Sequence, residues 1–334
     1  MNQFNSNSNN ERFILNEEDD LEDFGSRPYD RSIPELLNNG IIFVDKQSGP
    51  TSHQIVSWVR SLLKQNKAGH SGTLDPQVTG LLPIGLGDAT KALSILLYGP
   101  KEYVAVIRLH NDVNPESFRN CISDFTGKIF QKPPQRSAVK RRTRTREIYN
   151  IESLDFKGRL ICLKILCEAG TYVRKLIYDI GEVLECGATM IELRRTKVMH
   201  IDETTQFVKL HDLNDALYLW KSNNQDEKIR SIVKPVEFIS KPLDSIMLRS
   251  SAIDSICHGA QLAIPGILNF STSIKKGDIV SFVTQKEELI AIAKSELSAL
   301  ELKENTKGIA GITQRVIMKP GTYPKMWKKS QTHE

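Results

Sequence analysis

The chain has 334 residues, 40% of them hydrophobic and 25% charged, with a formal net charge of +5. This composition is ordinary for a soluble globular protein, and the length suggests two domains. No apolar run approaches the ~18–20 residues of a membrane-spanning helix, and the polar first ten residues show no sign of a secretory signal peptide. The five cysteines form no C-x-x-C pair and no zinc knuckle, so we expect small buried thiols and a reducing, cytoplasmic location.

Charge is unevenly distributed along the chain. Residues 11–23 carry seven acidic side chains against one arginine, and we expect the polar, acidic extension 1–30 to be disordered or ordered only by docking. A basic cluster within residues 136–146 contains no acid and consists of Arg136, Lys140, Arg141, Arg142, Arg144 and Arg146. It could neutralise several phosphates, although most charge runs are solvated faces.

The first regular elements are predicted after the extension. Residues 41–44 form a short apolar strand, and the turn at 48–50 leads into a helix. Thr51 and Gln54 at its start have the spacing of a capping box. The apolar residues that follow repeat at helical spacing, which predicts one buried face.

The most unusual stretch is residues 69–87, where five glycines and two prolines surround one carboxylate, Asp75. Glycine permits sharp turns and close approach to a ligand, and Pro76 stiffens the backbone directly after Asp75. Such a loop presents its carboxylate in one geometry, as a nucleophile must be presented. The alternative is that Asp75 only caps a turn, as Asp before Pro often does.

The string His-Ser-Gly-Thr-Leu-Asp-Pro at residues 70–76, followed by Val-Thr-Gly-Leu-Leu-Pro-Ile at 78–84, resembles the central motif of the tRNA pseudouridine synthase B family. The nearest match is the archaeal and eukaryotic dyskerin branch, which works in H/ACA guide-RNA particles. The resemblance implies an isomerase that converts uridine to pseudouridine without a metal or an organic cofactor. It also implies that Asp75 is the nucleophile, or a base on the sugar, and that His70 helps to hold the opened RNA.

Two further segments carry the resemblance. Residues 45–53 resemble the family's opening motif, with Gln47 in place of an expected proline. Lys46 in this motif is a candidate phosphate contact or a surface lysine, and its position favours structural support of the active loop. Residues 102–109 alternate as a strand, in which Tyr103 is a core residue or, as the resemblance implies, packs under the target uracil.

Asn114 and Pro115 predict the start of a further helix. The prolines at 133 and 134 then interrupt regular structure ahead of the basic cluster, and this segment resembles the family's substrate-gripping loop. The whole basic cluster is therefore a candidate RNA contact. Strands are expected at residues 147–155 and 160–168.

Residues 169–181, which begin Ala-Gly-Thr-Tyr-Val-Arg-Lys, form a second signature with a helical apolar stripe. Tyr172 and Arg174 share a direction only if the chain enters this helix extended. By resemblance, Tyr172 lies near the base, where it handles the C5 proton, and Arg174 pairs with Asp75. Such a pair at ~4 Å and an effective dielectric of ~20 is worth about 4 kcal/mol before desolvation, enough to hold the carboxylate charged in a partly buried site. Leu193, in a third block, is either strand core or a leucine packed at the active site.

Polar residues 221–236 predict a boundary between a catalytic domain at 31–236 and a second domain at 242–320. The second domain has short predicted strands and one helix that stops at Gly259. It resembles a PUA domain, a small RNA-binding barrel, in which Gly259 and Ala260 would allow close approach of an RNA backbone. A barrel without RNA contact is the alternative.

The sequence thus predicts an α+β protein of archaeal type, with a mixed-sheet pseudouridine synthase catalytic domain followed by a small β-barrel PUA domain. Expected partners are tRNA or rRNA substrate, an H/ACA guide RNA and small H/ACA proteins, with no membrane. A stand-alone enzyme for the T-loop uridine of tRNA and a catalytically idle RNA-binding scaffold are the alternatives. The joint presence of Asp75, Tyr103, Tyr172 and Arg174 argues against the scaffold.

Overall fold

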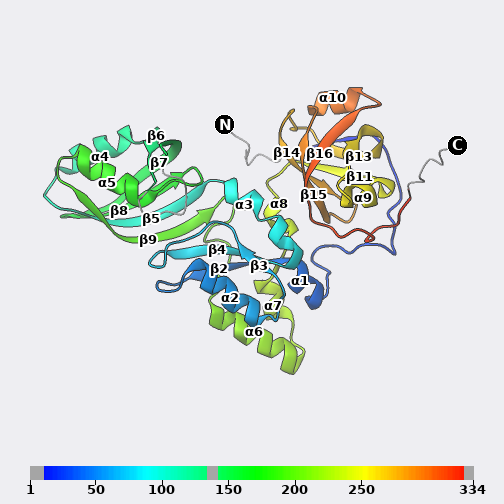
Figure 1. The fold of residues 1–334 in the computed structure, drawn as a ribbon, viewed down its shortest axis with the longest axis horizontal. Coiled ribbons are helices and arrows are strands. Elements are labelled where there is room, and N and C mark those ends of the chain that lie inside the picture. Colours follow the sequence, from blue (N-terminus) through cyan, green and yellow to red (C-terminus); the bar gives the residue numbers. More distant parts are fainter. Residues whose placement is uncertain (1–10, 134–141, 327–334) are drawn as a thin grey trace.

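The computed structural model describes residues 11–133 and 142–326. Its larger domain contains β2 (Gly40–Lys46), β3 (Ala68–His70), β4 (Thr79–Leu86), β5 (Lys101–Leu109), β6 (Gly127–Gln131), β7 (Arg144–Lys157), β8 (Leu160–Cys167), β9 (Ala188–Val198) and β10 (Lys234–Pro235). These strands form one sheet in the order β10-β2-β4-β9-β5-β8-β7-β6, with β3 paired to β4 beside this path (Figure 1). The sheet is mixed, because β4 and β9 run parallel whereas β2–β4 and β5–β9 are antiparallel.

The helices of this domain are α1 (Ile33–Asn39), α2 (Ser52–Leu62), α3 (Ser94–Tyr98), α4 (Pro115–Asp124), α5 (Val173–Val183), α6 (Leu210–Asn223), α7 (Glu227–Ile232) and α8 (Glu237–Ser240). Apolar faces of α1, α2, α6 and α7 pack on β2 and β4, whereas α4 and α5 pack on β5, β7 and β8. The predicted capping box of Thr51 and Gln54 is present at the start of α2, and Asn114 caps α4. The sheet therefore carries two separate helical layers, one on each half.

Residues 221–236 do not form the predicted polar boundary. They contain the end of α6, helix α7 and strand β10, and Ile229 and Ile232 of α7 are buried against Leu36 and Leu37. The prediction was wrong because only the outer faces of these short elements are polar, and their few apolar residues enter the core of the larger domain.

The smaller domain contains β11 (Ser245–Leu248), β12 (Leu262–Ala263), β13 (Ile267–Ser271), β14 (Ile279–Val283), β15 (Leu289–Ser295) and β16 (Ile309–Val316), with α9 (Ser250–Cys257) and α10 (Ala299–Glu304). Side chains from all these strands and both helices meet in one buried cluster, so the sheet curls around a single core (Figure 1).

The described part of the N-terminal extension docks on this smaller domain. Strand β1 (Arg12–Ile14) pairs with β13 and extends its sheet to seven strands, in the order β1-β13-β11-β14-β15-β16-β12. Glu18 forms an ion pair with Arg249 at 3.0 Å, and the ammonium of Lys286 donates to three carbonyls at residues 21–24. Of the two expectations for the extension, ordering by docking holds for residues 11–30.

The two domains share a buried interface. Leu289, Ile292 and Ile317 of the smaller domain belong to one apolar cluster with Ile41 and Phe43 of β2. Beside this cluster, Arg31 donates two hydrogen bonds to Glu237 at 2.8 and 2.9 Å, and Glu237 accepts the backbone N–H of Leu289 at 2.9 Å. The apolar cluster and these hydrogen bonds fix the two domains relative to each other. Among the described residues, none of the helices has the length and apolarity needed to span a bilayer.

Candidate active site

The predicted partners Asp75 and Arg174 meet on the surface of the larger domain. Asp75 lies in the loop between β3 and β4, and Arg174 lies in the first turn of α5. The guanidinium Nη2 donates to Asp75 Oδ2 at 2.6 Å. The side chains are 57% and 59% exposed, so the expectation of a partly buried site is wrong. Solvent screens the pair, which lowers its attraction well below the ~4 kcal/mol of the two bare charges.

A buried lysine supports the loop from below. Lys46 is 0% exposed, and its ammonium donates to the carbonyls of Gln47, Pro76 and Val78 at 3.0, 2.8 and 2.8 Å. Burial lowers the pKa of Lys46, and the nearby Asp75 partly offsets this. All three donors point to carbonyls inside the protein, so Lys46 has the support role and does not reach a phosphate at the surface.

Sequence reasoning missed two other supports of the loop. Ser52 Oγ, at the start of α2, accepts the N–H of Leu74 at 2.9 Å and donates to the Leu74 carbonyl at 3.1 Å. Arg195 is 1% exposed and donates to the carbonyls of Leu81 and Gly72 at 2.8 and 3.1 Å. The sequence offered two signals for these supports: Ser52 lies inside the opening motif, and Arg195 is the second arginine of the third block.

Gly80 shows how closely the loop is packed on β9. Its φ is +99°, and a Cβ there would lie 2.2 Å from the Arg195 carbonyl carried by the parallel neighbouring strand. Only glycine fits this position. The backbone on both sides of Asp75 is therefore held by contacts that the sequence motif encodes.

Tyr103 and Leu193 lie on neighbouring strands next to these supports. Tyr103 of β5 pairs with Arg195 of β9, and Leu193 pairs with Ala105, so all four side chains belong to one region of the sheet. Burial raises the pKa of Tyr103, and the adjacent Arg195 opposes the shift. Both predicted residues are half-buried and pack against the core below α5. The proposed contacts with a base stay predictions.

Tyr172 is the residue that precedes α5. Its φ of −92° and ψ of 96° are extended, but Gly170 has a φ of +80° and Val173 and Arg174 already belong to the helix. The predicted condition for Tyr172 and Arg174 to share a direction, an extended entry, is therefore not met. The residue is half-buried. Tyr172 thus stands one residue before the helix that carries Arg174, at the same end of the helix as Asp75.

His70 lies at the end of β3, and its ring centroid is 5.0 Å from that of His53 on α2. Burial lowers the pKa of His70 to about 4, helped by the nearby His53 and Arg195. Its Nδ1 is buried without a hydrogen-bond partner. At neutral pH the ring is uncharged, so any contact with RNA would use its face or its ring nitrogens rather than a charge.

The basic cluster divides into three kinds of position. Arg136, Lys140 and Arg141 lie outside the described residues. Arg142 is exposed, whereas Arg144 is half-buried on β7. Arg146 forms an ion pair with Glu168 at 3.4 Å and is 19% exposed. Arg142 thus faces solvent, whereas Arg146 is engaged within the protein, and the contacts of the cluster with RNA stay predictions.

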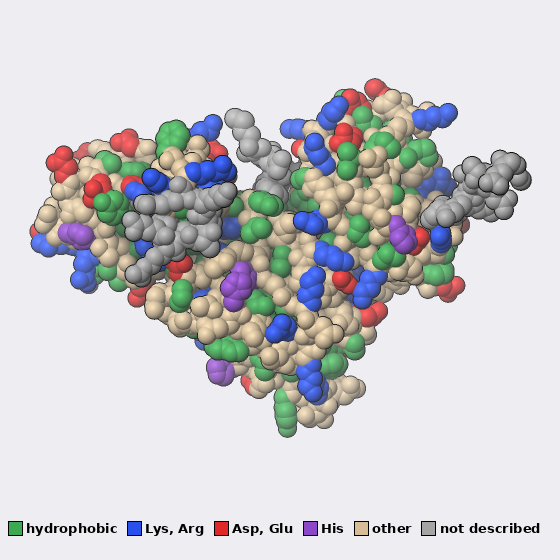
Figure 2. All heavy atoms as spheres, viewed as in Figure 1, with side chains coloured by type: hydrophobic (Ala, Val, Ile, Leu, Met, Phe, Trp, Pro, Cys, Tyr) green, Lys and Arg blue, Asp and Glu red, His purple; other side chains and the backbone are tan. Residues whose placement is uncertain are grey.

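Basic side chains also extend over other parts of the surface. Figure 2 shows Lys and Arg spread over both domains in this view, with few acidic side chains in the middle. At the end of α9, Gly259 and Ala260 are exposed, and no atom lies within 4 Å of a Cβ built on Gly259. An RNA backbone would meet no steric obstacle there, and the contact stays a prediction.

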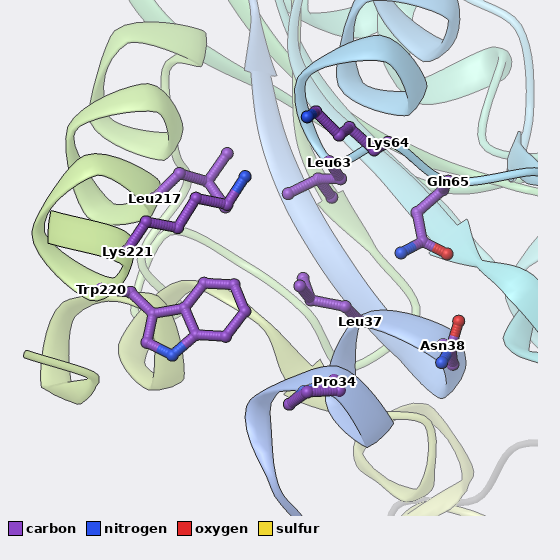
Figure 3. Close-up of a pocket in the computed structure, with 9 residues that line it drawn as sticks. All are labelled: Pro34, Leu37, Asn38, Leu63, Lys64, Gln65, Leu217, Trp220 and Lys221. Carbon is purple, nitrogen blue, oxygen red and sulfur yellow. The ribbon is translucent and has the colours of Figure 1, made fainter. Parts of the chain in front are cut away.

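An apolar hollow lies away from this site. A cavity of about 210 Å³ is lined by residues of α1, the end of α2 and α6, including Leu37, Leu63 and Trp220, and by no residue of the site (Figure 3). Asp75 instead stands on an open surface, which suits a polymeric substrate that covers the site when it binds. Among the described residues, no group of three or more His, Cys, Asp or Glu side chains could hold a metal ion.

Comparisons with known proteins agree with this geometry. Residues 60–173 match the TruB family pseudouridylate synthase (N-terminal domain), and residues 174–240 match the tRNA pseudouridylate synthase B C-terminal domain. A PUA domain matches residues 244–317, and a DKCLD (NUC011) domain matches residues 8–56.

Relatives and solved structures cover almost the whole chain. A probable tRNA pseudouridine synthase B of Pyrobaculum arsenaticum is 45% identical over 97% of this chain and 98% of its own, and one of Methanosarcina barkeri is 46% identical over 92% and 91%. An H/ACA RNP bound to a substrate RNA containing 2'-deoxyuridine has 40% identity and a TM-score of 0.88, covering 95% of this chain and 97% of that chain. A Cbf5-Nop10-Gar1 complex has 42% identity and the same TM-score, covering 95% and 96%. The predicted fold class and family resemblance are confirmed. The chain belongs to the TruB family of pseudouridine synthases, isomerases that act on RNA, and it has a C-terminal PUA domain.

Proposed function

We propose that this chain is the catalytic subunit of an archaeal H/ACA guide-RNA particle and that Asp75 is its catalytic carboxylate. The observation that carries the proposal is the Asp75–Arg174 pair, held 2.6 Å apart on a loop that Lys46 and Arg195 fix from below. The match to the H/ACA structure over 95% of the chain supports the particle.

The reaction balances without an external reactant. The bond between N1 of the uracil and C1′ of the ribose breaks, a bond between C5 and C1′ forms, C5 loses a proton and N1 gains one. The target base must first leave its stack, at a cost of a few kcal/mol. Asp75 attacks the substrate or removes a sugar proton, Tyr103 and Leu193 pack against the base, Tyr172 handles the C5 proton, and Arg174 holds Asp75.

The partners follow from the same comparison. The matched complexes contain substrate RNA, Nop10 and Gar1, and we propose a guide RNA and small proteins of this kind as partners here. The basic cluster would contact substrate, and the surface at Gly259 and Ala260 would contact guide RNA or a tRNA end. Five free thiols support a cytoplasmic location.

A second candidate substrate is the T-loop uridine of tRNA, modified without a guide. It is favoured by the tRNA pseudouridine synthase B name of the relatives, and the two activities can coexist. Pseudouridine formation on tRNA alone, compared with formation on an rRNA fragment with and without its guide RNA and small proteins, separates them. Turnover of the rRNA fragment without a guide would contradict the guide-dependent assignment.

Asp75→Asn tests the catalytic assignment. This substitution keeps the shape of the loop and removes the charge, so pseudouridine formation should fall by at least about 10³-fold while RNA affinity stays within about 2-fold. Asp215→Asn is the matched control, because Asp215 is similarly exposed but lies on α6. Substantial turnover by Asp75→Asn would remove Asp75 from the mechanism.

A further inference from the structure

Gln131, a buried glutamine that belongs to none of the motifs described above, contacts the turn that leads into α5. Gln131 ends β6 and is only 2% exposed. Its Nε2 donates to the carbonyl of Tyr172 at 3.2 Å, and its Oε1 accepts the N–H of Tyr172 at 2.9 Å. One carboxamide thus binds both backbone polar groups of a single residue that is 41 positions away.

The two bonds constrain the entry to α5. Tyr172 is the N-cap residue of this helix and has no side-chain cap, and its carbonyl also accepts the N–H of Leu176 at 3.0 Å. A carboxamide offers a donor and an acceptor in one plane, as the edge of a strand does, so it favours the extended backbone observed at Tyr172. That conformation sets where Tyr172 and Arg174 lie relative to Asp75.

The preceding turn is held by the neighbouring strand. Arg146 of β7 pairs with Glu168, and Glu168 accepts the N–H of Glu147 at 3.1 Å. The Arg146 guanidinium also lies against Gly170, where a Cβ would be 3.1 Å from Nη2. Strands β6 and β7 pair with each other at Gln131 and Arg144. Side chains of these two strands therefore bind residues 168–172 from one side.

We propose that Gln131 is a positioning residue of pseudouridine formation, which acts through the backbone of Tyr172 to place Tyr172 and Arg174 against Asp75. The proposal rests on the roles proposed above for these three residues. Gln131 does not touch the substrate. Because small displacements of catalytic groups cost large factors in rate, its loss should lower the rate of chemistry more than the affinity for RNA.

The first test compares Gln131→Met with a purely structural substitution. Gln131→Met keeps the length and removes both hydrogen bonds, so the single-turnover rate at saturating RNA should fall at least about 10-fold, with RNA affinity within about 2-fold. Glu301→Met is the control, since it removes the capping box of α10 in the PUA domain. It should lower the unfolding temperature and leave the single-turnover rate unchanged. A Gln131→Met variant that behaves like this control overturns the proposal.

The second test uses protonation and does not depend on Gln131→Met being stable. In Gln131→Glu the ionised carboxylate has no donor for the Tyr172 carbonyl, whereas the protonated acid restores one donor and one acceptor. The ratio of its single-turnover rate to that of the wild type should rise at least about 5-fold as the pH is lowered from 8 toward 5. A flat ratio overturns the proposal. An inactive Asp75→Asn beside a fully active Gln131→Met overturns this proposal alone, whereas a fully active Asp75→Asn overturns it together with the proposed function.

Discussion

The Asp75–Arg174 pair and the two cations beneath it lie in opposite environments. Asp75 and Arg174 are 57% and 59% exposed and form an ion pair in solvent. Lys46 and Arg195 are 0% and 1% exposed and donate to backbone carbonyls, and Arg195 also interacts with the hydroxyl of Tyr103. Asp75 and Arg174 are therefore accessible to a substrate, whereas Lys46 and Arg195 support the loop by hydrogen bonds. We infer that different cations orient the Asp75 carboxylate and support its loop, so the two roles can be separated by mutation.

Arg195→Met should give the largest of the following effects, because it removes one of the two buried cations beneath the site. The carbonyls of Leu81 and Gly72 lose their donors, and each buried carbonyl left unpaired costs about 1–3 kcal/mol. The free energy of unfolding should fall by roughly 2–5 kcal/mol, with activity lost as the loop loosens. The control is Arg108→Met on the exposed side of β5, expected within about 0.5 kcal/mol of the wild type in denaturant unfolding. Equal stabilities for both variants would remove the distinction between the exposed pair and the buried cations.

Arg174→Met should show the converse behaviour. An exposed ion pair contributes at most about 1 kcal/mol to stability, so the unfolding temperature should barely change. The single-turnover rate should fall about 10²-fold, because Asp75 loses the group that orients it. Arg174→Lys should recover only part of the rate, since an ammonium lacks the planar geometry of a guanidinium. A wild-type rate in Arg174→Met would show that the pair is only a surface contact.

His70, half-buried at the end of β3, should make the stability of the protein sensitive to acid. Its pKa is about 4 when folded and about 6.5 when unfolded, so the unfolded chain binds more protons between these values. This contribution to stability is present above pH 6.5 and is lost as the pH falls toward 4, at up to about 1.4 kcal/mol per unit. The stability advantage of the wild type over His70→Phe should shrink across that window. An advantage that is constant from pH 7 to 4 would contradict the burial of a neutral ring.

The smallest expected effect is a difference between Arg142 and Arg146 in the salt dependence of RNA binding. Arg142→Gln removes an exposed cation and should lower the salt slope of substrate RNA binding by about 0.7–0.9. Arg146 is paired with Glu168, so Arg146→Gln should leave the slope unchanged. Affinity titrations from low to moderate salt measure both. Equal slopes for the two variants would show that both arginines meet phosphate, or that neither does.

Local patterns and motif resemblance predicted much of this molecule. The cap of α2, the strand at Tyr103 and the pairing of Asp75 with Arg174 follow from short-range signals or from a motif shared with the family. The prediction that residues 221–236 are a polar linker was wrong, because helices with few apolar residues resemble linkers in composition, whereas the predicted domain limits at 236 and 242 stay predictions.

Other features depend on contacts that no local pattern contains. Strand β1 pairs with residues more than 250 positions away, and Gln131 meets Tyr172 across a sheet edge. Sequence patterns left open whether Lys46 contacts phosphate or supports the loop, because both roles need the same residue in the same motif. Only the positions of the three carbonyls decide between them.

The separation of these two roles is tested most directly by measuring the unfolding temperature and the single-turnover rate on the same samples of wild type, Asp75→Asn and Lys46→Met. We predict that Asp75→Asn loses turnover and melts within about 2 °C of the wild type, since its charge is exposed. Lys46→Met should melt several degrees lower, at about 2–4 °C per kcal/mol lost, because the carbonyls of Gln47 and Val78 lose this donor and that of Pro76 keeps only the N–H of Gly49. A Lys46→Met protein as stable as the wild type, or an Asp75→Asn protein that melts early yet keeps its turnover, would contradict the account.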